Sequence, residues 1–95
     1  MNTNEIINEL QRIKPHIQHE YAVKTVGLFG SFADGTNTDS SDVDILVEFE
    51  KPIGWKFFKL EKYLENILNR KIDLVTINAL NEHVKYYALR QVKYV

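Results

Sequence analysis

The sequence contains no cysteine, which excludes disulfide bonds and thiolate metal sites. No apolar run approaches the roughly 20 residues that a membrane-spanning helix needs. The first residues show neither the basic nor the apolar segment of a secretory signal. The 12 Lys and Arg residues nearly balance the 13 Asp and Glu residues, so no overall charge attracts the chain to nucleic acid or to a membrane. We therefore expect a cytoplasmic protein with no membrane partner.

The length of 95 residues allows one modest hydrophobic core and is too short for two. No repeat, low-complexity segment or linker interrupts the chain. We therefore expect a single domain over residues 1–95.

The charges are unevenly placed along the chain. Residues 25–50 contain six acidic residues and no Lys or Arg, whereas nine basic and four acidic residues follow from Lys51 onward. An acidic centre beside a basic C-terminal half suits a metal site that also holds a polyphosphate. Ordinary solvated surfaces explain most of these charges equally well.

Hydrophobic spacing predicts three helices. The first carries Ile6, Leu10 and Ile13 on one face, and Asn2 with Glu5 forms a capping pair at its start. Pro15 is expected to end this helix, or to open a second short one that runs to about Glu20. The second helix spans about 55–68 and stops at Asn69, and the last spans about 79–92, with an apolar stripe of Leu80, Val84, Tyr87 and Gln91.

Three apolar runs, at about 24–29, 42–49 and 71–76, are typical of strands. A loop over 33–41, rich in Gly, Thr, Asn, Asp and Ser, separates the first two, and one helical turn can follow Ser31. Strands that alternate with helices predict an α/β (α+β) fold, in which a small mixed β-sheet packs against the helices.

The most informative pattern is Gly30-Ser31, ten intervening residues, and then Asp42-Val43-Asp44. Residues two apart on a strand share one face, so Asp42 and Asp44 point the same way while Val43 points into the protein. Two neighbouring carboxylates repel each other unless a cation lies between them. Mg²⁺ prefers a few carboxylates together with substrate phosphate oxygens. The pattern therefore indicates phosphate chemistry.

This pattern, with a further strand carboxylate at Asp73, resembles the signature of the DNA-polymerase-β-type nucleotidyltransferases. The length, the Gly-Ser-Phe-Ala segment and the strand from Ser41 to Phe49 are similar to the minimal, single-domain branch of that superfamily. Members of this branch are antitoxins encoded beside a HEPN-domain ribonuclease toxin. The resemblance covers nearly the whole chain.

The resemblance implies a role for each residue of the motif. Gly30 would let the backbone approach the nucleotide phosphates, and Ser31 would offer its hydroxyl and N–H to a terminal phosphate oxygen. Asp42 and Asp44 would hold two Mg²⁺ ions, and Asp73 would complete one of these sites and help to take the acceptor proton. The reaction would transfer AMP from ATP to a tyrosine of the toxin.

Two features depart from the family pattern. Asp34 stands where many members have a basic residue, so a phosphate contact is missing or is supplied by Lys51, Lys71 or Arg90. The chain also has no room for the extra domains with which larger relatives bind the base or the acceptor. These departures favour an alternative, a binding antitoxin that blocks its toxin stoichiometrically. Nucleotide transfer to RNA ends is disfavoured because no basic, aromatic-lined groove is visible.

Other residue groups have simpler interpretations. His16, His19 and His83 are expected on the surface rather than as metal ligands. Most of the large aromatic residues are expected in the core, although those of the last helix and tail could also contact a partner protein. They are Trp55, Phe57, Phe58, Tyr86, Tyr87 and Tyr94.

Overall fold

The computed structural model describes all residues from 1 to 95. The elements in chain order are α1 (Thr3–Tyr21), β1 (Val23–Phe29), α2 (Ser31–Asp34), β2 (Val43–Phe49), α3 (Lys56–Leu68), β3 (Ile72–Thr76), a 3-10 helix η1 (Ile77–Ala79), α4 (Glu82–Gln91) and β4 (Lys93–Tyr94). The predicted strands and helices are present with bounds that differ by a few residues at most, except in the first helix. The last strand was not predicted.

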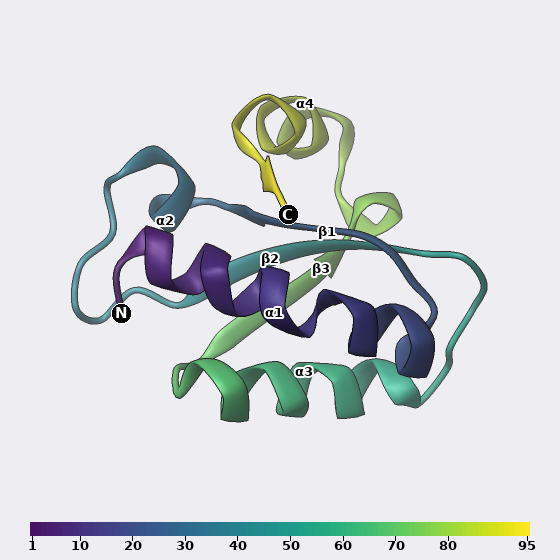
Figure 1. The fold of residues 1–95 in the computed structure, drawn as a ribbon. Coiled ribbons are helices and arrows are strands. Elements are labelled where there is room, and N and C mark those ends of the chain that lie inside the picture. Colours follow the sequence, from purple (N-terminus) through teal and green to yellow (C-terminus); the bar gives the residue numbers. More distant parts are fainter.

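The four strands form one mixed sheet in the order β3-β2-β1-β4. β1 runs antiparallel to β2 and to β4, whereas β2 and β3 are parallel and are joined through α3. Helices α1 and α3 lie side by side on one face of this sheet, and α4 lies on the other side (Figure 1). This arrangement confirms the predicted fold class.

The core lies between the sheet and the helices α1 and α3. It contains alternate residues of the strands, such as Val43, Ile45 and Val47, together with one face of each helix. The helix residues are Ile6, Leu10, Ile13 and Ile17 of α1 and Leu60, Leu64 and Leu68 of α3. Because side chains alternate along a strand, the residues between the core positions point to the opposite face of the sheet.

Helix α1 is one unbroken helix, so the predicted break at Pro15 is wrong. Pro15 is exposed, and the carbonyl of Gln11, which loses its intrahelical partner there, can bond to water on the same side. Ile13 and Ile17 are buried on either side of the proline and keep both halves on the sheet. The predicted capping pair is confirmed, because the Asn2 side chain accepts from Glu5 N–H and the Glu5 carboxylate accepts from Asn2 N–H.

The inward face of α4 is shifted by one residue from the predicted stripe. Val84, Tyr87 and Gln91 are exposed, whereas their next neighbours Lys85, Ala88 and Val92 are half-buried or buried. A β-carbon on Gly27 of the sheet would lie 2.5 Å from Val92 Cγ2, so the missing side chain of Gly27 makes room for Val92. Because Ala88 is small and Gly27 has no side chain, this end of the chain can lie close to the sheet.

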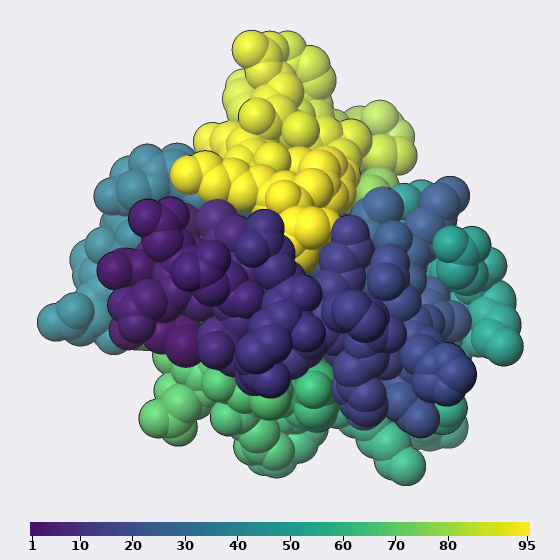
Figure 2. Space-filling view, in the orientation of Figure 1, coloured from purple at the N-terminus to yellow at the C-terminus, as the bar shows by residue number.

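Most of the aromatic side chains that were predicted to fill the core are exposed, and only Phe57 among them packs against it. The exposed fraction is 85% for Trp55 and 64% for Tyr87, and Phe58, Tyr86 and Tyr94 are also exposed. Aliphatic residues and Phe32 fill the core instead. Helix α4 protrudes from the body of the molecule, whereas the yellow C-terminal end lies against the body (Figure 2).

The end of the chain is attached to the sheet edge through β4. Tyr94 pairs with Gly27, and Val95 N–H donates to Val26 O at 3.0 Å. Lys14 Nζ of α1 donates to Val95 O at 2.6 Å. β4 was not predicted because a strand of two residues is too short to show an alternating hydrophobic pattern. No helix combines the length and the apolarity that crossing a membrane requires.

Candidate active site

Three strand ends meet at one end of the sheet. β1 ends at Phe29, and its antiparallel neighbour β2 begins there, so Phe29 pairs with Asp44. β3 runs parallel to β2 and begins at the same end, so Asp44 pairs with Asp73. The two carboxylates and the turn after β1 are therefore neighbours, although Gly30, Asp44 and Asp73 lie far apart in the sequence.

The turn after β1 requires glycine. Gly30 has φ 71° and ψ −149°, a backbone conformation that L residues rarely adopt. A β-carbon at this position would collide with Asp44 Oδ2 and would lie 3.0 Å from Asp44 Cγ. The Gly30 backbone is thus in direct contact with the Asp44 carboxylate, and no larger residue fits between them.

Ser31 begins the one-turn helix α2 directly after Gly30. The carbonyl of Gly30 accepts from the N–H groups of Ala33 and Asp34 at 3.0 and 3.1 Å, which closes the turn. The side chain of Phe32 is buried, and its carbonyl accepts a 2.8 Å hydrogen bond from Thr3 Oγ1 of α1. These contacts fix Ser31 beside the carboxylates, at a half-buried position.

Asp44 is half-buried, and its pKa is raised to about 6. Loss of hydration is the largest cause, followed by the negative charges of Asp73 and Asp42. Asp42 and Asp73 are both exposed, and Val43 between the first two acids is fully buried. The predicted orientation of Asp42 and Asp44 agrees with this pattern, although Asp42 lies just before β2 rather than in it.

The structure contains no group of three or more His, Cys, Asp or Glu side chains arranged to hold a metal ion. The donor set nevertheless fits Mg²⁺, which in nucleotide sites is bound by one or two carboxylates together with phosphate oxygens and water. Asp44 and Asp73 lie opposite each other in the ladder, and the charge of Asp73 raises the pKa of Asp44, so a cation between them would relieve this repulsion. The three histidines are exposed, as predicted.

Asp34 makes a local turn. Its carboxylate accepts from Thr36 N–H at 3.0 Å and from Thr36 Oγ1 at 2.6 Å. These hydrogen bonds lower the pKa of Asp34, whose side chain is exposed. The residue that departs from the family pattern therefore carries a negative charge at the end of α2 and stabilises the turn at Gly35 and Thr36.

Among the three candidate phosphate contacts, Lys71 alone lines the space beside Asp42. A polar cavity of about 350 Å³ lies there, lined by Asp39, Ser40, Ser41, Asp42, Asn69, Arg70 and Lys71. Lys51 lies beyond the opposite end of β2, roughly 20 Å from Asp44 at about 3.3 Å per strand residue. Arg90 lies on α4 and stacks over Tyr86, with its guanidinium carbon 5.2 Å from the ring centroid.

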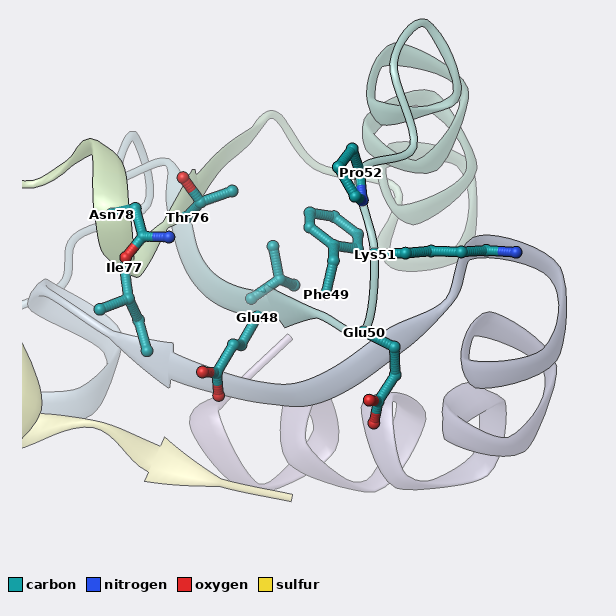
Figure 3. A pocket seen from close by; sticks show the side chains of 9 residues that line it. Glu48, Phe49, Glu50, Lys51, Pro52, Thr76, Ile77 and Asn78 are labelled. Atoms are coloured by element: carbon teal, nitrogen blue, oxygen red, sulfur yellow. The ribbon is translucent and has the colours of Figure 1, made fainter.

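A second cavity, of about 360 Å³, lies at the end of β2 and β3 away from the carboxylates. Glu48, Phe49 and Pro52 line one side of it, and Thr76 and Asn78 line the other, while Lys51 extends away from them (Figure 3). None of the motif residues Gly30, Ser31, Asp42, Asp44 and Asp73 lines this cavity, and Lys51 is the one candidate phosphate contact that does.

Two residues that the sequence did not single out also contact the site. Thr3 binds α2 as described, and Arg70 contacts both α2 and the loop that leads to Asp42. Neither belongs to the motif by spacing. Their contacts depend on which segments the fold brings together, so the sequence offered no signal for them.

Comparison with known proteins identifies the family. A model described as "Nucleotidyltransferase domain" matches residues 4–95. Protein adenylyltransferase MntA of Thermococcus cleftensis is 38% identical over 96 residues, which cover 100% of this chain and 97% of that protein. MJ1215 of Methanocaldococcus jannaschii, whose name assigns it provisionally to the protein adenylyltransferases, is 49% identical over 78 residues, or 81% of this chain and 91% of that protein.

Two solved structures show the same fold. A minimal nucleotidyltransferase superimposes with a TM-score of 0.85 at 24% identity, covering 98% of this chain and 95% of that one. A toxin–antitoxin crystal structure with AMP-PNP superimposes with a TM-score of 0.69 at 26% identity, covering 99% of this chain and 72% of that one. The sequence resemblance is therefore confirmed, and this chain belongs to the nucleotidyltransferase domain family.

Proposed function

We propose that this chain is an antitoxin that transfers an adenylyl group from ATP to a tyrosine of a HEPN-domain ribonuclease toxin in the cytoplasm. The observation that carries the proposal is the contact of Gly30 with the Asp44 carboxylate, with Asp73 opposite. The relative named protein adenylyltransferase and the solved toxin–antitoxin complex with AMP-PNP support this class of reaction and partner.

ATP would bind with its triphosphate over the turn after β1. Gly30 has no side chain there, and Ser31 and Phe32 begin α2 ahead of Ala33 and Asp34, whose N–H groups donate to Gly30 O. Ser31 would add its hydroxyl as a further donor to a phosphate oxygen. Lys71, beside Asp42, is the basic residue best placed to approach the polyphosphate.

The three carboxylates would orient the reacting groups. Asp42, Asp44 and Asp73 would hold two Mg²⁺ ions, which when bound stabilise the attacking and leaving oxygens of an in-line displacement at phosphorus. The raised pKa of Asp44 supports this role, because a half-buried carboxylate beside two others is stabilised in its charged form by a cation.

The acceptor would be a tyrosine hydroxyl of the docked partner. Its oxygen forms a bond to the α-phosphorus of ATP, the bond from that phosphorus to the bridging oxygen of the β-phosphate breaks, and pyrophosphate leaves. The hydroxyl proton passes to Asp73, which is exposed and open to an approaching side chain. Docking supplies the proximity that an acceptor-binding domain would otherwise provide.

Incubation with α-labelled ATP, Mg²⁺ and the purified toxin tests the proposal. We expect label on the toxin with the wild-type chain and none with Asp44→Asn, and Glu50→Gln at the far end of β2 serves as the matched control that retains transfer. Neutralisation of the toxin without label would support the binding antitoxin instead. Label found only on RNA would support transfer to RNA ends.

A further inference from the structure

Arg70 connects the two halves of the motif. It lies between α3 and β3, immediately after the left-handed residue Asn69. Its guanidinium carbon lies 5.0 Å from the centre of the Phe32 ring, and its Nη2 donates to the carbonyls of Asp39 and Ser41, each at 3.1 Å. One half-buried side chain therefore contacts both α2 and the loop before β2.

The contacts of Arg70 are adjacent to the site residues in the chain. Phe32 directly follows Ser31, and the Ser41 carbonyl belongs to the peptide bond whose nitrogen is that of Asp42. Arg70 therefore fixes the orientation of the peptide plane that precedes Asp42, while its flat face contacts the residue after Ser31. A planar guanidinium can form these contacts together, and a lysine ammonium has no flat face with which to stack.

The loop has few other attachments in this region. Residues 35–42 contain no helix or strand, and most of their side chains are exposed. Ser41 N–H donates to Thr38 O and Thr38 N–H donates to Ser41 Oγ, but these hydrogen bonds stay within the loop. Backbone pairing with the β3 segment begins only at Val43, whose N–H donates to Lys71 O at 3.0 Å.

We propose that Arg70 is a positioning residue, which holds Ser31 and Asp42 at the spacing that adenylyl transfer requires. This inference rests on the proposed function. It assigns Arg70 a role at the loop, where Nη2 donates to two backbone carbonyls. Misplacement of a reacting group by about 1 Å costs on the order of 100-fold in rate. We therefore expect Arg70→Ala to lower kcat about 10- to 100-fold, with a change in the KM for ATP of less than about threefold.

Two measurements on the full-length chain test this role. Hydrogen exchange of amides 38–43 should become faster in Arg70→Ala and in Arg70→Lys than in the wild type, while Arg12→Ala, which removes an exposed arginine of α1 paired with Glu9, should leave it unchanged. Transfer kinetics should show the loss in kcat, and methylguanidinium should partly restore the rate of Arg70→Ala and have no effect on Arg12→Ala. Arg70→Gln, which keeps a donor but loses the stacked face, provides a second variant if Arg70→Ala fails to fold.

The results separate this inference from the proposed function. Unchanged exchange of amides 38–43 in the Arg70 variants would overturn the inference, as would a rise in the KM for ATP with unchanged kcat, which would assign Arg70 to phosphate binding. A wild-type chain that transfers no label would instead overturn the proposed function, and hydrogen exchange would then decide alone whether Arg70 fixes the loop.

Discussion

Asp44, the second residue of β2, lies directly opposite Asp73, the second residue of β3, in the parallel ladder. Neighbouring strands are about 4.8 Å apart, so the two carboxylates start from adjacent positions on the face of the sheet that α1 and α3 leave uncovered. This pairing, with Gly30 against Asp44, is the relationship on which the proposed chemistry depends.

The stability of the chain should fall as Asp44 ionises. The pKa of folded Asp44 is about 6, above its ordinary value of 3.8, so this group stabilises the fold below pH 4 and loses that contribution as the pH rises through 6. A shift of this size corresponds to ~3 kcal/mol, which solvent screening of a partly exposed group reduces to about 1 kcal/mol.

Asp44→Asn should therefore be more stable than the wild type by about 1 kcal/mol at pH 7 without metal, and should match it near pH 4. Mg²⁺ at pH 7 should raise the melting temperature of the wild type and have less effect on the variant. Denaturant unfolding at several pH values measures the free energy of unfolding, and thermal unfolding with and without Mg²⁺ measures the melting temperature. Glu50→Gln is the control in each experiment. If the free energy of unfolding had the same pH dependence in the wild type and Asp44→Asn, the raised pKa of Asp44 would be contradicted. Equal rises in melting temperature on addition of Mg²⁺ would contradict its role in holding the metal.

Gly30→Ala should damage both stability and transfer. The new β-carbon meets a glycine-specific backbone conformation and collides with the Asp44 carboxylate, so we expect a loss of about 2–4 kcal/mol in unfolding free energy and no transfer of AMP. Gly54→Ala is the matched control, because Gly54 also has a positive φ, 56°, but has no atom within 4 Å of the added carbon. That control should lose about 1 kcal/mol and retain transfer. Equal losses in the two variants would show that the contact with Asp44 is unimportant.

The sequence predicted those features that depend on local spacing. Alternation along the second strand placed Val43 in the core and Asp42 and Asp44 away from it, and the helical period predicted α3 to within one residue at its start. The spacing from Gly30 to Asp42 indicated a candidate site for phosphate chemistry, because it resembles the motif of a known family.

The features that were missed depend on contacts between distant segments. Pro15 does not break α1 because Ile13 and Ile17 are buried on either side of it. The inward face of α4 is set by the space above Gly27, which the helix sequence alone does not reveal. The role of Arg70 needs three segments to be placed together, so no pattern within one of them could indicate it.

The exposed aromatic patch of α4 and β4 should contact the partner protein. The patch consists of Val84, Tyr86, Tyr87, Leu89 and Tyr94, all of which are exposed. Clustered exposed tyrosines are typical of protein interfaces. Tyr87→Glu should reduce co-purification with the toxin at least tenfold while leaving the binding of AMP-PNP unchanged. Phe58→Glu, at a similarly exposed aromatic on α3, is the control, and a greater loss in that variant would move the interface to α3.

Removing the charge of Asp34 should strengthen nucleotide binding. A unit charge about 10 Å from the triphosphate contributes roughly 0.4 kcal/mol in water, so Asp34→Asn should lower the Kd for AMP-PNP about twofold in low salt. Thr36→Val removes one hydrogen bond of the same turn but keeps the charge, and should not tighten binding. Calorimetric titration measures both. Tighter binding in Thr36→Val, or weaker binding in Asp34→Asn, would show that the turn matters and the charge does not.

Mass spectrometry of the toxin after reaction with this chain, ATP and Mg²⁺ tests the proposed chemistry most directly. We expect the mass of the toxin to rise in steps of one adenylyl group, and the addition to lie on a peptide that contains tyrosine. The reaction with Asp44→Asn should leave the mass unchanged. A fully neutralised toxin with no added mass in the wild-type reaction would contradict adenylyl transfer and would identify this chain as a binding antitoxin.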